Sequence, residues 1–187
     1  MSVRTLKNFL LSLVRISDKK RWANIENHDE NWSGRTEIMS KHVRPGESVF
    51  ELGAGRCHLR DMLPASCSYT PSDIVERLPG TFVCDLNQKP LPVFPKHDVA
   101  VASGVLEYVH ELPEVVTSLA ASFDRLIVSY ADTERYTSCR KRMRNGWFCN
   151  LSRRRFLEPF LAMGYELKAE AEWNRHGIYV FEKKRQS

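Results

Sequence analysis

From residue 48 to the end of the chain, short apolar runs alternate with stretches of helical pattern, and this alternation restricts the fold more than any other feature. Continuous apolar strands separated by helices predict a mainly parallel sheet covered on both faces. A turn around Asn174–Gly177 separates the last two runs and predicts an antiparallel pair. We therefore predict an α/β fold with a doubly wound, mainly parallel seven-stranded sheet. The expected strands are Ser48–Leu52, Cys67–Pro71, Thr81–Cys84, Asp98–Ala102, Arg125–Tyr130, Tyr165–Trp173 and Ile178–Phe181, and the expected helices include Leu59–Leu63, one starting near Pro113, and Phe156–Met163.

Two glycines, Gly53 and Gly55, directly follow the first predicted strand. Open sheets of this kind bind ligands at the carboxyl ends of their strands. Glycine there permits a tight turn and close approach of a ligand, and the next helix offers free N–H groups. A dinucleotide site would need a third glycine in G-x-G-x-x-G register, where this chain has His58. The pattern predicts a ligand site that does not hold a dinucleotide.

Polar residues follow the next strands in turn. Asp73 comes after the second strand, Asp85 after the third, and Ser103-Gly104 after the fourth. A carboxylate after the second strand can accept hydrogen bonds from ribose hydroxyls. Either Asp alone is more often a helix cap or a solvated turn residue, but their order along the chain favours a nucleoside ligand. The short stretch between the two Asp residues predicts a turn in place of a crossover helix.

The E-x-G-x-G run at residues 51–55 resembles the first motif of the class I S-adenosylmethionine-dependent methyltransferases, and the resemblance covers roughly residues 45–181. Cys57 stands where the family often has a third glycine, and Tyr108 where many relatives carry His. The resemblance implies a Rossmann-like fold, methyltransferase activity and S-adenosylmethionine as cofactor, with an acid at Asp85 for the adenine amino group. The cofactor-binding residues that it implies are Glu51, Gly53, Ala54, Gly55, Asp73, Ile74, Asp85, Leu86, Ser103, Gly104 and Trp32.

The segment 1–42 is predicted to form a helical lid over a cofactor-binding domain at 43–187. From the lid, Trp32 and Arg35 are candidates to stack on or pair with the cofactor, although Trp32 equally suits an anchor between lid and core. At its start, helical spacing of apolar residues predicts an amphipathic helix rather than a signal peptide. No apolar run approaches the roughly 18 residues of a membrane span, so we expect a cytoplasmic protein. The apolar residues at this spacing are Leu6, Phe9, Leu10, Leu13 and Val14.

His110 and Tyr108 are the candidate catalytic residues, because they follow the strand expected to face the transferred methyl group. A base is needed only when the acceptor atom holds its proton at neutral pH. A single His is more often structural than catalytic. The 5 cysteines are scattered without C-x-x-C spacing, and no metal site is predicted.

Eight basic residues and no acidic one lie between Arg135 and Arg155, more positive charge than the chain's net +5, so the remainder is net acidic. Such a local patch suits a small anionic acceptor better than a long nucleic-acid duplex. A solvated helix face explains the patch equally well. The residues predicted to contact substrate are Arg140, Arg144 and Trp147.

The predicted function is methyl transfer to an O or N atom of a small-molecule or glycan-like, anionic acceptor. After the fourth strand the chain lacks both the Asn/Asp-Pro-Pro-aromatic motif and the nucleophilic Cys of base methyltransferases. RNA methylation is a less favoured alternative. A second alternative is a catalytically idle subunit that binds a protein partner through its N-terminal helix.

Overall fold

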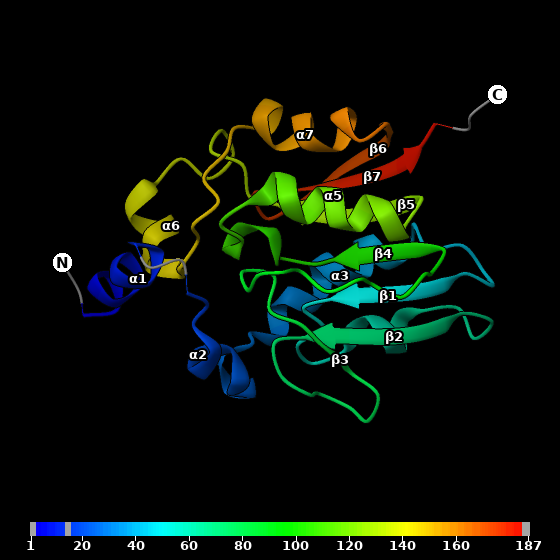
Figure 1. The fold of residues 1–187 in the computed structure, drawn as a ribbon, viewed down its shortest axis with the longest axis horizontal. Coiled ribbons are helices and arrows are strands. Elements are labelled where there is room, and N and C mark those ends of the chain that lie inside the picture. Colours follow the sequence, from blue (N-terminus) through cyan, green and yellow to red (C-terminus); the bar gives the residue numbers. More distant parts are fainter. Residues whose placement is uncertain (1–2, 14–15, 185–187) are drawn as a thin grey trace.

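The computed structural model describes residues 3–13 and 16–184, and Val14 of the predicted apolar stripe lies outside them. Within these residues seven strands form one sheet, in the order β3-β2-β1-β4-β5-β7-β6 (Figure 1). Only β7 runs antiparallel to its neighbours β5 and β6. The predicted fold class is confirmed. The strands are β1 Ser48–Leu52, β2 Ser68–Asp73, β3 Phe82–Val83, β4 Val99–Ala102, β5 Arg125–Tyr130, β6 Tyr165–Trp173 and β7 His176–Lys183.

Strands β1, β5 and β6 have the predicted bounds, whereas β2, β3, β4 and β7 differ from the prediction, β4 by starting one residue later, at Val99. Strand β2 continues to Asp73, because its last two residues pair with the short β3. Strand β7 begins at His176, before the predicted Ile178. Asn174 and Arg175 take φ of 40° and 67°, the left-handed conformation of a tight two-residue hairpin turn. Between β2 and β3 the described chain forms turns without a helix, as predicted.

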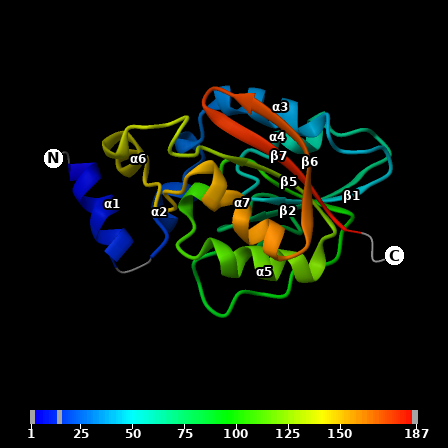
Figure 2. The same cartoon turned by 90° about the horizontal axis from the view of Figure 1, so that it is seen from above.

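Helices cover both faces of the sheet (Figure 2). Alternate strand residues, such as Phe50 and Leu126, pack with α5 and α7 on one face. Their neighbours Val49 and Ile127 pack with α3 and α4 on the other face. Because successive strand side chains point to opposite faces, continuous apolar strands supply both halves of the core. These helices are α3 Ser33–Ser40, α4 His58–Met62, α5 Leu112–Ser122 and α7 Arg153–Ala162.

The carboxyl ends of β1, β2 and β4 point toward the end of the molecule that carries α1 (Val3–Leu13), α2 (Lys19–Ala23) and α6 (Cys139–Asn145) (Figure 1). Short 3-10 turns at Ile25–Asn27 and Glu30–Trp32 connect α2 to α3. Because α3 already packs on the sheet, the N-terminal segment is continuous with the core, and the boundary at residue 42 stays a prediction. Across the described ranges, every helix is too short or too polar to cross a membrane.

Candidate functional site

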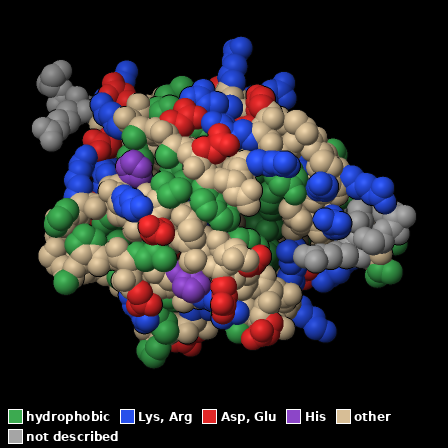
Figure 3. Space-filling view, turned by 180° about the vertical axis from the view of Figure 1, so that it is seen from behind, with side chains coloured by type: hydrophobic (Ala, Val, Ile, Leu, Met, Phe, Trp, Pro, Cys, Tyr) green, Lys and Arg blue, Asp and Glu red, His purple; other side chains and the backbone are tan. Residues whose placement is uncertain are grey.

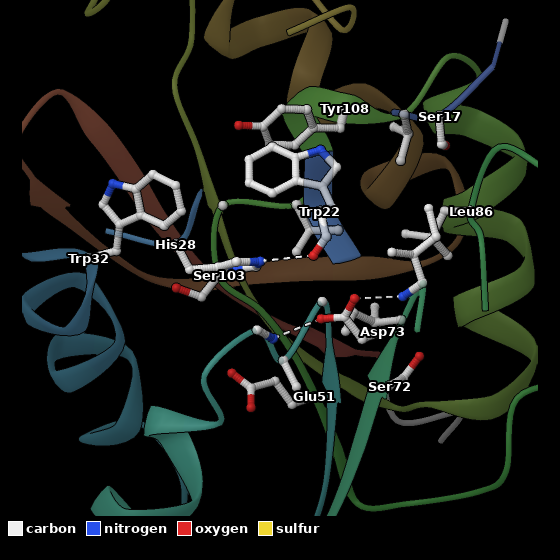
Figure 4. Close-up of a pocket in the computed structure, with 18 of the residues that line it drawn as sticks. Ser17, Trp22, His28, Trp32, Glu51, Ser72, Asp73, Leu86, Ser103 and Tyr108 are labelled. Carbon is white, nitrogen blue, oxygen red and sulfur yellow. Dashed lines mark hydrogen bonds between the residues drawn. The ribbon is translucent and has the colours of Figure 1, made fainter. Parts of the chain in front are cut away.

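A cavity opens at the carboxyl ends of the central strands, between the sheet and the N-terminal segment (Figure 4). Every residue that the sequence predicts to bind the cofactor lines this cavity, and so does Tyr108. The lining comes from the ends of β1, β2 and β4 with the loops that follow them, the segment after β3, residues 8–36, and two residues that follow α6. Among residues that the sequence reasoning did not single out for the site, Asn8, Ser17, Arg21, Trp22, Arg56, Asn87, Val105, Gly146 and Phe148 also line it.

The loop after β1 needs its glycines for two reasons. Gly53 and Gly55 have φ of 64° and 53°, which only glycine adopts without strain. A Cβ on Gly53 would overlap the Val105 side chain, and one on Gly55 would lie 2.7 Å from His28 Nδ1. Cys57 is also left-handed, at φ 58°, which explains why glycine suits this position in the family. The loop therefore turns tightly while packing directly against residues of the N-terminal segment.

Glu51 is a buried carboxyl group at the floor of the cavity. The Tyr69 hydroxyl donates a hydrogen bond to its Oε2 atom. Burial raises the pKa of Glu51 to about 8, and the nearby Asp73 charge adds to this effect. The group is therefore mostly neutral at pH 7, so the floor of the cavity carries less negative charge than the sequence suggests.

Asp73 ends β2 with its carboxylate directed into the cavity (Figure 4). It accepts hydrogen bonds from the backbone N–H groups of Gly55 (2.8 Å) and Ile74 (2.7 Å). Arg77 Nε lies 3.1 Å from its Oδ2, and both side chains are buried. Arg77 also donates to the backbone carbonyls of Trp22 and Ala23. The guanidinium thus links the end of β2 to the N-terminal segment (residues 8–36), which covers the cavity and is called the covering segment below.

Asp85 lies after β3 and is likewise engaged by the N-terminal segment. It accepts a 2.6 Å hydrogen bond from the Ser17 hydroxyl and one of 3.0 Å from the Asn87 backbone N–H. The Asn87 side chain in turn donates to Ser17 Oγ and to the Tyr108 carbonyl, at 2.8 and 2.9 Å. This network joins the segments after β3 and β4, and Leu86 lines the cavity beside it.

Ser103 and Gly104 directly follow β4 and line the cavity, and the Arg35 side chain of α3 contacts them. Arg35 Nε donates to Ser103 Oγ at 2.9 Å, and Nη2 donates to the Ser103 carbonyl at 3.2 Å. Gly104 has φ 68°, and a Cβ there would overlap the Arg35 guanidinium. The Gly104 N–H donates to Ser129 Oγ at 2.8 Å. A buried arginine therefore lies at the carboxyl end of β4.

Aromatic rings from three segments meet over the cavity (Figure 4). The Trp22 ring lies edge-on to Tyr108 at 4.9 Å and to His28 at 5.4 Å, and is 6.4 Å from Trp32. Burial lowers the pKa of His28 and raises that of Tyr108, so both side chains are neutral at pH 7. The N-terminal segment thus contributes three uncharged rings, Trp22, His28 and Trp32, to the lining of the cavity, beside its charged residues such as Arg21.

The remaining predicted site residues lie outside the lining of this cavity. His110 stacks on Phe148 with ring centroids 4.6 Å apart, and Phe148 rather than His110 reaches the cavity. Trp147 is buried, with the Arg142 guanidinium 5.2 Å from its ring. Arg140 and Arg144 are exposed on α6. The cations that line the cavity are instead Arg21, Arg35 and Arg56.

The basic stretch separates into structural and exposed residues. Arg135 pairs with Glu170 at 3.0 Å and Glu172 at 2.9 Å, and Arg153 also pairs with Glu170. Arg142 is buried and donates to Asn150 Oδ1 at 2.6 Å. The surface formed by residues 135–155 is therefore less basic than their sequence suggests, because some of these residues are buried or paired with acids. Among the described residues, no group of three His, Cys, Asp or Glu side chains is arranged to hold a metal ion.

The sequence matches no family model and no curated protein. The structure is similar to a 1,6-didemethyltoxoflavin-N1-methyltransferase from Burkholderia thailandensis, with a TM-score of 0.62 and 16% identity over 98% of this chain and 91% of that one. It is also similar to mitomycin 7-O-methyltransferase (TM-score 0.65, 12% identity, 95% of this chain and 60% of that one). A third similar structure is a methyltransferase of calicheamicin biosynthesis, with a TM-score of 0.63 and 12% identity over 81% of this chain.

The chain spans only 54% of the length of the calicheamicin enzyme. At identities this low, the likeness establishes the fold. The protein has the fold of the class I S-adenosylmethionine-dependent methyltransferases, with the strand order and the antiparallel β7 described above.

Proposed function

We propose that this protein transfers a methyl group from S-adenosylmethionine to an O or N atom of a small-molecule or glycan-like, anionic acceptor. One observation carries the proposal: every residue implied by the motif resemblance to bind this cofactor lines the same cavity, in a chain with the matching fold. The structural neighbours named above include methyltransferases of small molecules, which supports an acceptor of that size.

The residues present fit the cofactor. Asp73 suits the ribose hydroxyls and Asp85 the adenine amino group, since carboxylates accept hydrogen bonds from both. Arg35 offers a buried cation beside Ser103 for the methionyl carboxylate. Gly53 leaves room where a side chain would overlap Val105. In this arrangement residues 1–42 act as the lid, with Trp32 and Trp22 over the ligand.

S-adenosylmethionine supplies an activated methyl group on a sulfonium when bound, so the protein's task is alignment and exclusion of water. The neutral phenol of Tyr108 lines the cavity and can donate a hydrogen bond to the substrate that accepts the methyl group. His110 stands behind Phe148 and is proposed to act from that side of the site. Arg21 and Arg56 supply positive charge within the cavity for an anionic acceptor.

Both carboxylates proposed to bind the cofactor already have partners within the protein. Asp73 pairs with Arg77, and Asp85 accepts a hydrogen bond from Ser17. Cofactor entry must therefore displace contacts of the covering segment, which couples binding to movement of the lid. Arg140, Arg144 and Trp147 remain proposed contacts for an acceptor that extends beyond the cavity toward α6.

Calorimetric titration with S-adenosylmethionine tests the proposal on the native chain and on Gly53→Arg, Gly53→Ala and Asp73→Ala. Gly46→Ala is the matched control, because Gly46 has φ 86° and open space around its Cβ position. We expect micromolar binding by the native chain and the control, and at least about a tenfold loss in the other three, or roughly 1.4 kcal/mol. A well-folded native chain that does not bind would contradict the proposal and favour the idle, partner-binding alternative.

The alternative function, RNA methylation, is tested by a second measurement, which is binding of RNA. Binding of RNA oligonucleotides that weakens steeply with salt would favour it. A small acceptor predicts instead that cofactor-loaded protein turns over with low-molecular-mass anionic compounds or glycans, and that RNA neither binds nor competes.

A further inference from the structure

Helix α1 buries a polar side chain and exposes several apolar ones. Asn8 is 2% exposed, and its Nδ2 donates to the carbonyls of Met143 (3.0 Å) and Arg144 (3.1 Å) of α6. The apolar side chains of Val3, Leu6 and Leu10 are 87%, 46% and 53% exposed. A surface helix of a globular protein ordinarily turns its apolar stripe toward the core. Here a polar side chain is buried, and three apolar side chains on the opposite side of the helix are exposed to solvent.

Apolar exposure is concentrated at this end of the molecule. Among the described residues, half of the exposed large hydrophobic side chains lie between residues 3 and 16, including Ile16 just after the helix. Helices α1 and α6 lie side by side in both ribbon views (Figures 1 and 2). We define the α1–α6 surface by the residues Val3, Leu6, Leu10, Ile16, Arg140, Lys141 and Arg144.

The α1–α6 surface is also cationic. Neither helix contains an acidic residue. Arg140, Lys141 and Arg144 are exposed, and no ion pair with another described residue holds them. Lys7 is the exception, since Asp18 pairs with it at 2.7 Å. Lys and Arg side chains gather at this end in the space-filling view as well (Figure 3).

We propose that the α1–α6 surface docks on a lipid bilayer that contains anionic phospholipid. An apolar helix face bordered by Lys and Arg is the arrangement that lies in the interface of such a bilayer. Basic residues close to an anionic membrane surface are attracted to it, and salt weakens this attraction. A second copy of the chain would bring like charges together, and a polyanion such as RNA would leave the leucines unused.

This orientation also places the bilayer beside the cavity. Asn8 of α1 and Gly146 at the end of α6 both line the cavity. Docking would therefore bring the opening between the N-terminal segment and the sheet close to the membrane surface. The docking proposal stands on the surface residues alone and does not depend on the methyl-transfer activity.

Co-sedimentation with lipid vesicles tests the proposal on the full chain. The vesicles are phosphatidylcholine alone, or phosphatidylcholine with about one third phosphatidylglycerol, at low salt and at roughly 0.5 M salt. We expect binding to the anionic vesicles that weakens with salt. The double variant Leu6→Asp with Leu10→Asp should bind at least about tenfold more weakly. Arg140→Glu with Lys141→Glu should show a similar loss, and supplies a second test should the leucine variant unfold.

Matched controls come from α7, on another part of the surface. Leu161 is 51% exposed, close to the value for Leu10, and Arg155 is exposed like Arg140. Leu161→Asp and Arg155→Glu should bind vesicles as the native chain does. No sedimentation with anionic vesicles at low salt would overturn the proposal. Equal losses in the α7 controls would also overturn it. So would binding that is unchanged in the leucine variant and depends on charge alone, because the apolar face would then play no part. A dimer in solution that Leu6→Asp dissociates would assign the face to a second copy instead.

Discussion

The Arg77 guanidinium lies 3.1 Å from the Asp73 carboxylate and at the same time donates to the Trp22 carbonyl, so one side chain joins the end of β2 to the covering segment. A buried carboxylate at this strand end is suited to ribose hydroxyls, yet here it is already paired. A ligand bound at Asp73, as proposed above, would therefore have to share this carboxylate with Arg77 or displace it.

Replacement of Arg77 by Met should destabilise the ligand-free protein by roughly 3 kcal/mol, because a buried carboxylate loses its cation. S-adenosylmethionine should then stabilise the variant more than the native chain, since its hydroxyls replace the missing donor. Urea unfolding with and without the cofactor measures both effects. Arg60→Met, which breaks an exposed pair with Asp61, is the control and should change stability by less than about 1 kcal/mol. Equal stability of the Arg77 variant and the native chain would refute the role given to this pair.

Addition of a methyl group at Gly104 should disturb Arg35. Gly104→Ala places a Cβ within the Arg35 guanidinium at a positive φ. We expect about 2–4 kcal/mol of destabilisation from overpacking and backbone strain together, and weaker cofactor binding. Thermal unfolding and calorimetry measure these changes. Gly80→Ala has the same strain at φ 86° but open space, so it should cost only about 1–2 kcal/mol and leave binding intact. An equal effect of the two substitutions would show that the Arg35 contact does not matter.

Stability should fall as pH rises because of Glu51. Burial raises the pKa of Glu51 from 4.5 to about 8, so between these values the folded protein holds a proton that the unfolded chain has released. The contribution of Glu51 to the free energy of unfolding is therefore largest below about pH 4.5. It falls as pH rises and is lost above about pH 8. Urea unfolding of native protein and Glu51→Gln across this window measures the difference, which should amount to a few kcal/mol. The variant should keep a flatter profile, and parallel profiles would contradict the buried neutral carboxyl.

Cofactor binding should change the tryptophan fluorescence through the lid. Trp22 and Trp32 line the cavity, whereas Trp147 and Trp173 do not. A ligand that enters alters the surroundings of the first pair only. Titration with S-adenosylmethionine should change the emission of the native chain and of Trp173→Phe by similar amounts, and the change should shrink in Trp22→Phe and Trp32→Phe. A signal that disappears with Trp173 would place the ligand elsewhere.

The sheet could be predicted because its strands are continuous apolar runs bounded by turn residues. The positions after those strands followed directly, since parallel strands bring their carboxyl ends to one edge. Gly53, Asp73, Asp85 and Ser103 therefore meet in one cavity although they are far apart along the chain. The two-residue length of β3 was not predictable, because its pairing depends on how far β2 extends.

Local pattern could not predict which residues of the N-terminal segment reach the cavity, or which members of the basic stretch are buried. Trp22 and Arg21 reach the cavity through a short helix and turns that carry no motif. Arg142 appears in the sequence as one member of a charged run, yet it is buried and bonded to Asn150. Whether an arginine in such a run is exposed or structural depends on partners distant in sequence, such as Glu170 for Arg135.

The contacts of Gly55 with His28 and of Gly104 with Arg35 have a consequence for exchanging parts between proteins of this fold. The covering segment fits against two places that have no side chain, so each half is shaped for the other. A chimera that joins residues 1–42 of this chain to another domain of this fold should close over the cavity only where that domain also has no side chain at both positions. Recombination across this boundary is therefore expected to succeed only between matched pairs, because the segment forms one wall of the cavity and is not an interchangeable module.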